Sequence, residues 1–265
     1  MTITIEQQDW QKVLAEVVGT FFFFFVGIMS VATAGNNGAF SVLYIALAHG
    51  VALAIAISAL GHISGGHFNP AVTVAMMVAR RISPISGVLY ILGQIIGGLG
   101  ACLAIVVVLP ERIWGNAGIS LGVPAVNTQV ISVGQAIGLE AILTFFLVMA
   151  VFGTAVDPRA NRVAGFGIGL TVFVDILIGG PISGGAMNPA RAIAPAIISG
   201  KWADWYVWWV GPIIGAVIAG LLYAFVFLPR GDEPVIEAPA LMDEPLEAPL
   251  SEPNLINDDF LRDNE

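Results

Sequence analysis

Two eight-residue segments of the sequence carry polar residues suited to binding chemistry in a largely apolar chain. They read Ser-Gly-Gly-His-Phe-Asn-Pro-Ala at 64–71 and Ser-Gly-Gly-Ala-Met-Asn-Pro-Ala at 183–190. Asn is a preferred helix N-cap and Pro a preferred first helical residue, so each Asn-Pro-Ala predicts the start of a helix. The free N–H groups and positive dipole end of such a helix, with an amide side chain beside them, suit the binding of a polar solute.

The composition places these segments in a membrane. Charged residues make up 11% of the chain, apolar residues 57%, and the mean hydropathy is +0.87, whereas soluble domains average about 25% charged residues. So few charges cannot cover a soluble surface, which excludes a soluble enzyme and a nucleic-acid-binding protein. Six apolar stretches are long enough to cross roughly 30 Å of hydrocarbon as helices. They are residues 13–34, 39–60, 85–109, 131–155, 163–182 and 205–228.

The charges predict an orientation and a separate tail. Residues 229–265 hold eleven acidic residues against Arg230 and Arg262, which accounts for the whole net charge of −9. That composition is typical of disorder, so we expect a membrane domain at 1–228 and an acidic, disordered tail at 229–265. Most basic residues fall on one side of the spans, which predicts that both termini are cytoplasmic. These residues are Lys12, Arg80, Arg81, Arg159, Arg162 and Arg230.

The two halves of the chain, about 12–110 and 131–228, resemble each other. Glu16-Val-Val-Gly-Thr-Phe-Phe recurs 124 positions later from Glu140, and the Asn-Pro-Ala segments are 119 positions apart. A Gly-x-x-x-Gly pair also recurs 118 positions on, at Gly93 and Gly97 and then at Gly211 and Gly215. Because each half holds three spans, the second half enters the membrane upside down, and such inverted repeats form a shared site near the midplane.

The short apolar segments after the two Asn-Pro pairs are predicted to meet inside the membrane. Each has about ten residues, or about 15 Å of helix, so two end to end cover the hydrocarbon core. Non-helical backbone at that depth is stable only where it is packed in protein or lines water. The sequence therefore predicts an all-α membrane protein with six transmembrane helices and two half-helices in an inverted repeat around a pore.

These paired motifs, Asn69-Pro70-Ala71 and Asn188-Pro189-Ala190, resemble those of the major intrinsic proteins, the aquaporins, and the resemblance covers about residues 12–228. It implies one pore per chain, a homotetramer in the lipid bilayer, and passive passage of water and small neutral solutes, without a cofactor, a metal or enzymatic activity. A water molecule held between the two Asn amides must turn its hydrogens outward. That breaks the relay along which a proton would move, while the two helix N-termini repel cations.

The resemblance also implies a selectivity ring of His49, Ile176, Gly185 and Arg191. Burying an arginine in a membrane is costly, so we expect Arg191 to repel cations and to donate hydrogen bonds to the solute. Pairing with a carbonyl is the alternative for Arg191, and packing against a neighbouring span is the alternative for His49. The set is similar to that of plant tonoplast intrinsic proteins associated with ammonia as well as water, although their extra loop histidine has no counterpart after Val123-Pro124.

Other polar residues in the apolar body have two interpretations. His67, two residues before Asn69, is expected to line the cytoplasmic vestibule. Glu16 and Glu140 either relay protons or accept bonds from backbone N–H groups of the loops before the half-helices, and their repetition favours the structural role. Asp175 has no role that the pattern explains.

Three other functions remain open. The family's glycerol branch typically has Asp after the second Asn-Pro-Ala-Arg, where this chain has Ala192, so a glycerol or urea facilitator is the nearest rival. An ion- or proton-coupled transporter would use the buried carboxylates, and a scaffold would conduct nothing. We expect the plasma (cell inner) membrane as the location, and the sequence indicates no partner for the tail.

Overall fold

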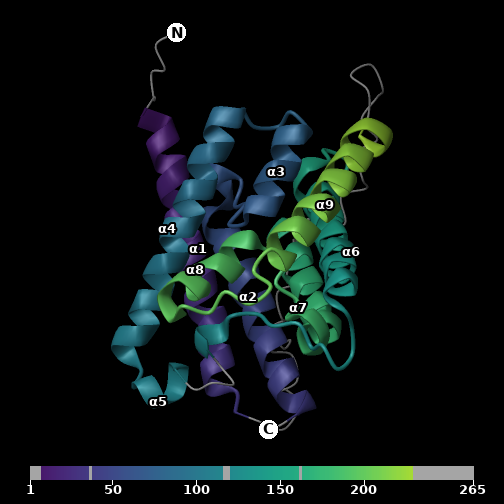
Figure 1. Cartoon of the computed structure of the whole chain (residues 1–265). Helices are drawn as coiled ribbons and strands as arrows, with labels where there is room; N and C mark the ends of the chain where they lie inside the picture. The colour runs from purple at the N-terminus through teal and green to yellow at the C-terminus, as the bar shows by residue number, and fades with distance from the viewer. Residues whose placement is uncertain (1–6, 36–37, 116–119, 161–162, 229–265) are drawn as a thin grey trace, which may run out of the picture.

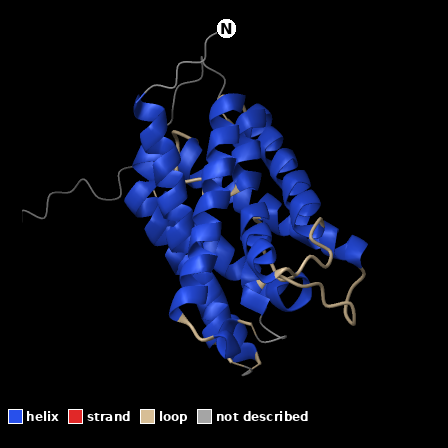
Figure 2. Cartoon of the chain, turned by 60° about the vertical axis from the view of Figure 1, so that its left-hand side comes forward, coloured by secondary structure: helices blue, strands red, loops and turns tan. Residues whose placement is uncertain are grey.

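The computed structural model describes residues 7–35, 38–115, 120–160 and 163–228, and the expected tail lies outside these residues. The described residues form helices joined by loops and turns, without a strand, which confirms the all-α prediction (Figure 2). Six helices are long and apolar enough to cross a membrane. They are α1 (Gln7–Thr33), α2 (Ala39–Ser64), α4 (Pro84–Val108), α6 (Val133–Val151), α7 (Ala164–Ser183) and α9 (Val207–Leu222), where α6 and α9 are continued by helical turns to Val156 and Phe227.

Two half-helices follow the Asn-Pro-Ala motifs, as predicted. They are α3 (Pro70–Val78) and α8 (Pro189–Ser199). In Figure 1 α3 lies toward the face where α1 begins and α9 ends, which we call the N-terminal face, and α8 lies toward the opposite face. A short helix, α5 (Glu111–Trp114), and a 3₁₀ turn (Ser120–Gly122) join the two halves; neither was predicted, because each is too short to give a periodic pattern.

Each half is held together by a close crossing of its first and last spans. The pairs are α1 with α4 and α6 with α9, and the long contact between α2 and α7 joins the halves. The repeated Gly-x-x-x-Gly pairs permit the crossings, since a Cβ atom on Gly97 would overlap the carbonyl of Val17 and one on Gly215 that of Ala141. Small residues let helix backbones approach in this way in membranes.

The helices before the two half-helices end in the same way. α2 continues four residues beyond its predicted end and stops at Ser64, where Gly65 adopts φ 93°, and α7 stops at Ser183, where Gly184 adopts φ 89°. This left-handed conformation favours glycine and turns the chain back into the membrane. The structure thus gives the Ser-Gly-Gly of both segments a role that the sequence pattern had not explained.

Hydrogen bonds among polar residues join the loop between α6 and α7 to the turn that follows α9. α6 and α9 each finish in a π-helical turn, Phe152–Val156 and Tyr223–Phe227. Asp157 accepts hydrogen bonds from Arg159 at 2.7 and 2.9 Å and from the Tyr223 hydroxyl at 3.2 Å, and Arg159 also donates to the Phe227 carbonyl. The Arg159 hydrogen bonds lower the pKa of Asp157 to about 2.

Candidate pore

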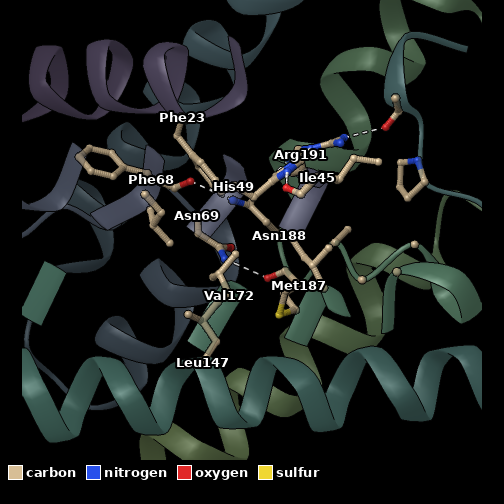
Figure 3. A pocket seen from close by; sticks show the side chains of 18 of the residues that line it. Phe23, Ile45, His49, Phe68, Asn69, Leu147, Val172, Met187, Asn188 and Arg191 are labelled. Atoms are coloured by element: carbon tan, nitrogen blue, oxygen red, sulfur yellow. Dashed lines mark hydrogen bonds between the residues drawn. The ribbon is translucent and has the colours of Figure 1, made fainter. Parts of the chain in front are cut away.

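A cavity of about 270 Å³ lies between the two halves, and its wall contains seven of the predicted pore residues (Figure 3). Its wall is mostly apolar. It includes residues of α1, α2, α6 and α7, of the loops before α3 and α8 and the first turns of these half-helices, and of the segment after the 3₁₀ turn. Pockets that combine an apolar wall with a few placed polar groups suit small solutes. The predicted residues in the wall are His49, His67, Asn69, Ile176, Gly185, Asn188 and Arg191.

The two half-helices are tied to each other at their N-termini. The Asn69 side-chain nitrogen donates to the Met187 carbonyl at 2.9 Å, and that of Asn188 donates to the Phe68 carbonyl at 2.9 Å (Figure 3). Each Asn also caps its own helix, because its side-chain oxygen accepts from the backbone N–H two residues on. An amide has two N–H groups, and among the described residues each Asn nitrogen has one acceptor, so one N–H can donate to a solute.

These reciprocal ties depend on an unusual backbone conformation. Phe68 and Met187 have φ of 45° and 52°, which is uncommon for residues other than glycine. The conformation presents their carbonyls to the opposite half, and both side chains are fully buried. The ties were not predicted, although the position before Asn is apolar in both repeats.

The His49–Arg191 pair is fixed by hydrogen bonds on both sides. The His49 Nδ1 lies 2.8 Å from the Ile45 carbonyl, which can only accept, so Nδ1 carries the proton and Nε2 the lone pair. Arg191 Nε donates to that Nε2 at 3.3 Å, and Arg191 Nη1 donates to the Gly122 carbonyl at 2.8 Å. Arg191 therefore both lines the cavity and pairs with a carbonyl, so the two interpretations of this residue hold together. No sequence signal had identified Gly122.

The rest of the ring is apolar. Ile176 lines the cavity from α7, and Gly185 has φ 55°. A Cβ atom on Gly185 would lie 3.1 Å from the Gly180 nitrogen, so the backbone there requires glycine. Phe23 of α1, which the sequence did not single out among five consecutive phenylalanines, packs edge-on against His49 with 6.0 Å between ring centroids.

Glu16 and Glu140 support the loops before the half-helices. Glu16 accepts from the Ser64 hydroxyl and from the backbone N–H groups of His67 and Phe68, at 2.7 to 2.9 Å. Glu140 accepts from the Ser183 hydroxyl and from the backbone N–H groups of Ala186 and Met187, at 2.7 to 3.1 Å. These bonds satisfy buried donors that would otherwise lack partners.

His67 is oriented by a network that exists in the first half. Its Nδ1 lies 3.1 Å from the Thr73 hydroxyl, which donates to the Asn69 carbonyl at 3.0 Å and accepts from Gln94 at 3.0 Å. Because the hydroxyl proton is used on Asn69, His67 Nδ1 is the donor, and the Nε2 of this cavity-lining residue carries a lone pair.

Two further polar residues stay out of the cavity wall. Asp175 is 2% exposed on α7, and its Oδ2 has no hydrogen-bond partner among the described residues. Cys102 is fully buried on α4. The geometry adds no role for either in solute contact.

The fold and this site define a helical membrane channel built from an inverted repeat. The family model described as "Major intrinsic protein" matches residues 4–223. The chain is 42% identical over 229 residues to Aquaporin-8 of Mus musculus, covering 86% of this chain and 85% of that protein. It is 41% identical over 232 residues to Aquaporin TIP4-4 of Zea mays, covering 83% and 88%.

Comparison with a solved structure shows the same fold. The aquaglyceroporin from Plasmodium falciparum superimposes with a TM-score of 0.70 at 23% identity, over 82% of this chain and 96% of that one. The chain belongs to the major intrinsic protein family, the aquaporins. It is therefore an integral multi-pass membrane protein and a passive channel for small molecules rather than an enzyme.

Proposed function

We propose that the chain conducts water, together with ammonia or a similar small neutral solute, and excludes ions and protons. One observation carries the proposal: the His49–Arg191 pair, Ile176 and the two tied asparagines line one cavity. The names of the relatives, which are aquaporins at about 40% identity, support the proposal that water is conducted. The narrower choice of solute depends on the ring.

Water is expected to pass by exchanging hydrogen bonds with donors placed along the wall. The free amide N–H groups of Asn69 and Asn188 point donors at one place, and the unpaired N–H groups of Arg191 supply another. A solute oxygen that accepts there must orient its own hydrogens away, which interrupts a proton relay. The Arg191 charge and the two helix N-termini add a positive potential that opposes cations.

Ammonia is expected to pass because part of the ring offers no hydrogen bonds. Both nitrogens of His49 are occupied, one by Ile45 and one by Arg191. Ile176 has no polar atom, so a solute with fewer hydrogen bonds than water loses less there. The donors of Arg191 face the lone pair of ammonia as they would face that of water.

The family and the charge distribution also support proposals for the domain bounds, the orientation in the membrane and the oligomeric state. We place the channel domain at 1–228, with its two repeats at about 12–110 and 131–228, and treat 229–265 as a separate tail. The basic residues on one side of the spans favour cytoplasmic termini, and the plasma membrane is our proposed location. Exposed apolar side chains on the outer faces of the helices suit contact with lipid and with the other subunits of a homotetramer.

The test is solute flux in proteoliposomes by stopped-flow light scattering. We expect water permeability well above that of empty vesicles, no electrical current, and ammonia flux followed with an internal pH dye. Ile176→His should reduce the ammonia flux and spare water, because it adds a donor to the apolar side of the ring. Glycerol or urea flux as fast as water would favour the facilitator, and flux that follows the membrane potential would favour a coupled transporter.

A further inference from the structure

Gly27 of α1 occupies the space beside the His49–Arg191 pair without itself lining the cavity. We propose that Gly27 determines the selectivity of the pore by leaving room for the His49 ring to reach Arg191. The inference rests on the proposed function, since it concerns how the same ring discriminates among solutes.

The absence of a side chain at Gly27 is required by the His49 ring. A Cβ atom built on Gly27 would lie 2.5 Å from His49 Nε2, 2.6 Å from Cδ2 and 3.0 Å from Cε1. The closest of these three atoms is the nitrogen that accepts from Arg191 Nε. A methyl group there therefore competes for the place where the two ring residues meet.

The imidazole has little freedom to avoid such a methyl group. Its Nδ1 is bonded to the Ile45 carbonyl on its own helix at 2.8 Å, and Phe23 packs edge-on against the ring. Any displacement must break a hydrogen bond or move the ring and Arg191 into the cavity. Both outcomes change the polar part of the wall that His49 and Arg191 form.

Helix α1 is also unable to yield easily. Phe24 and Ile28, which flank Gly27 at three and one residues, are fully buried. The Ser30 hydroxyl donates to the Gly27 carbonyl at 2.6 Å and helps to fix that turn. Close-packed interiors resist added volume, so the strain falls on His49.

The second half indicates that this position does not need glycine for helix packing. At the repeat offset of 124, Gly27 corresponds to Val151 of α6, which is buried in the core. At the offset of 119, His49 corresponds to Ile168 of α7. Glycine thus occurs in the half where the matching α2 position is His49, and valine in the half where the matching α7 position is Ile168.

The experiment compares four proteins in proteoliposomes: wild type, Gly27→Ala, His49→Ala and the double variant. Gly27→Ala should lower methylamine flux by about tenfold and the ammonia and water fluxes by less, because a larger solute responds more steeply to a narrowed ring. Adding Gly27→Ala to His49→Ala should change each flux by less than about twofold, because the clashing ring is gone. Gly138→Ala is the matched control, since its Cβ would meet no atom within 4 Å.

The other possible results distinguish a failed role of Gly27 from a folding defect and from a protein that conducts no solute. An unchanged flux in Gly27→Ala, or the same fold loss with and without His49, would overturn the role of Gly27. If Gly27→Ala fails to fold, a folded double variant still supports the clash with His49, whereas a double variant that also fails to fold overturns it. A wild-type protein that conducts no solute would instead reject the proposed function, which the empty-vesicle comparison reveals separately.

Discussion

The two re-entrant segments, 64–78 and 183–199, have the same frame and different linings. In each, a buried glutamate holds the loop, an Asn caps the half-helix, and that Asn is tied to the carbonyl before the other Asn. A hydrogen bond to a serine carbonyl is also repeated. The Tyr90 hydroxyl donates to the carbonyl of Ser64, and the Trp208 indole N–H donates to that of Ser183. The shared frame places two half-helices end to end.

The lining differs at the ring. Taken by the repeat offset of 119, the four ring residues correspond to four other residues of the same cavity wall. The pairs are His49 with Ile168, Ile176 with Ile57, Gly185 with Gly66, and Arg191 with Val72. The apolar and glycine positions keep their type, and both polar positions lose it. The potential along the pore is therefore asymmetric although the backbone is nearly symmetric.

The vestibule also differs between the two halves. The network of His67, Thr73 and Gln94 belongs to the first half, and its repeat counterparts are Ala186, Ala192 and Pro212. The ring takes its polar residues from both halves, His49 from the first and Arg191 from the second, whereas the vestibule network lies in the first half. Residues that repeat hold the frame, and residues that do not repeat give the pore its chemistry.

The largest expected effect comes from removing the shared glutamates. Glu16→Gln and Glu140→Gln each place an amide N–H against donors that need an acceptor, so each should cost about 3 kcal/mol of stability or more. The loss should be similar in the two halves, and slightly greater for Glu16 because Gln94 also donates to it at 2.7 Å. Thermal unfolding in detergent measures both; full stability in either variant would show that the two halves are supported differently.

A large effect on selectivity is expected at Arg191. Arg191→Val gives the ring the residue of its repeat counterpart, Val72, and removes the positive charge that opposes cations. Proton and cation leak should rise by about tenfold or more, which corresponds to about 1.4 kcal/mol of barrier. A pH dye in proteoliposomes measures the leak, with Val72→Ala as the control. A leak that stays at the wild-type level would mean that the helix N-termini supply the barrier without Arg191.

The sequence predicted the frame well because the frame is repeated. The helix starts at Pro70 and Pro189 follow from local capping chemistry, and the six spans follow from hydrophobic length. The meeting of the half-helices follows from adding their lengths. These features depend on local or repeated patterns, which a single sequence displays.

The missing features depend on contacts between distant segments. The Gly122 carbonyl reaches Arg191 from a loop with no motif, and the ties from Asn69 and Asn188 end on backbone atoms. A carbonyl has no residue type that a pattern can register. The tautomer of His49 likewise required its two partners to be seen together.

A smaller effect is expected at the second half's cluster of Asp157, Arg159 and Tyr223. Asp157→Asn should lower stability by about 1–2 kcal/mol near neutral pH, since it weakens the bond to Arg159. The pKa of Asp157 is lowered to about 2, below an unfolded value of about 3.9, so its contribution is present above about pH 4 and is lost as the pH falls toward 2.

The first half supplies the control for that prediction. Thr33, the repeat counterpart of Asp157 at offset 124, donates to the Met29 carbonyl within its own helix. Thr33→Ala should therefore change stability little and give no difference between pH 7 and pH 2. Thermal unfolding at both pH values checks this, and an Asp157→Asn effect that persists at pH 2 would mean that charge is not its cause.

The smallest expected effect is at His67, and it tests whether the vestibule network acts on the solute. His67→Ala gives the first half the residue of its counterpart, Ala186. Loss of one acceptor worth about 1 kcal/mol should reduce water flux by up to about fivefold. Thr73→Val should act in the same direction but less strongly, because it removes the acceptor of the Nδ1 proton and leaves the ring in place. Water flux that rose in both variants would show instead that His67 narrows the vestibule, and that the polar asymmetry of the halves matters at Arg191 alone.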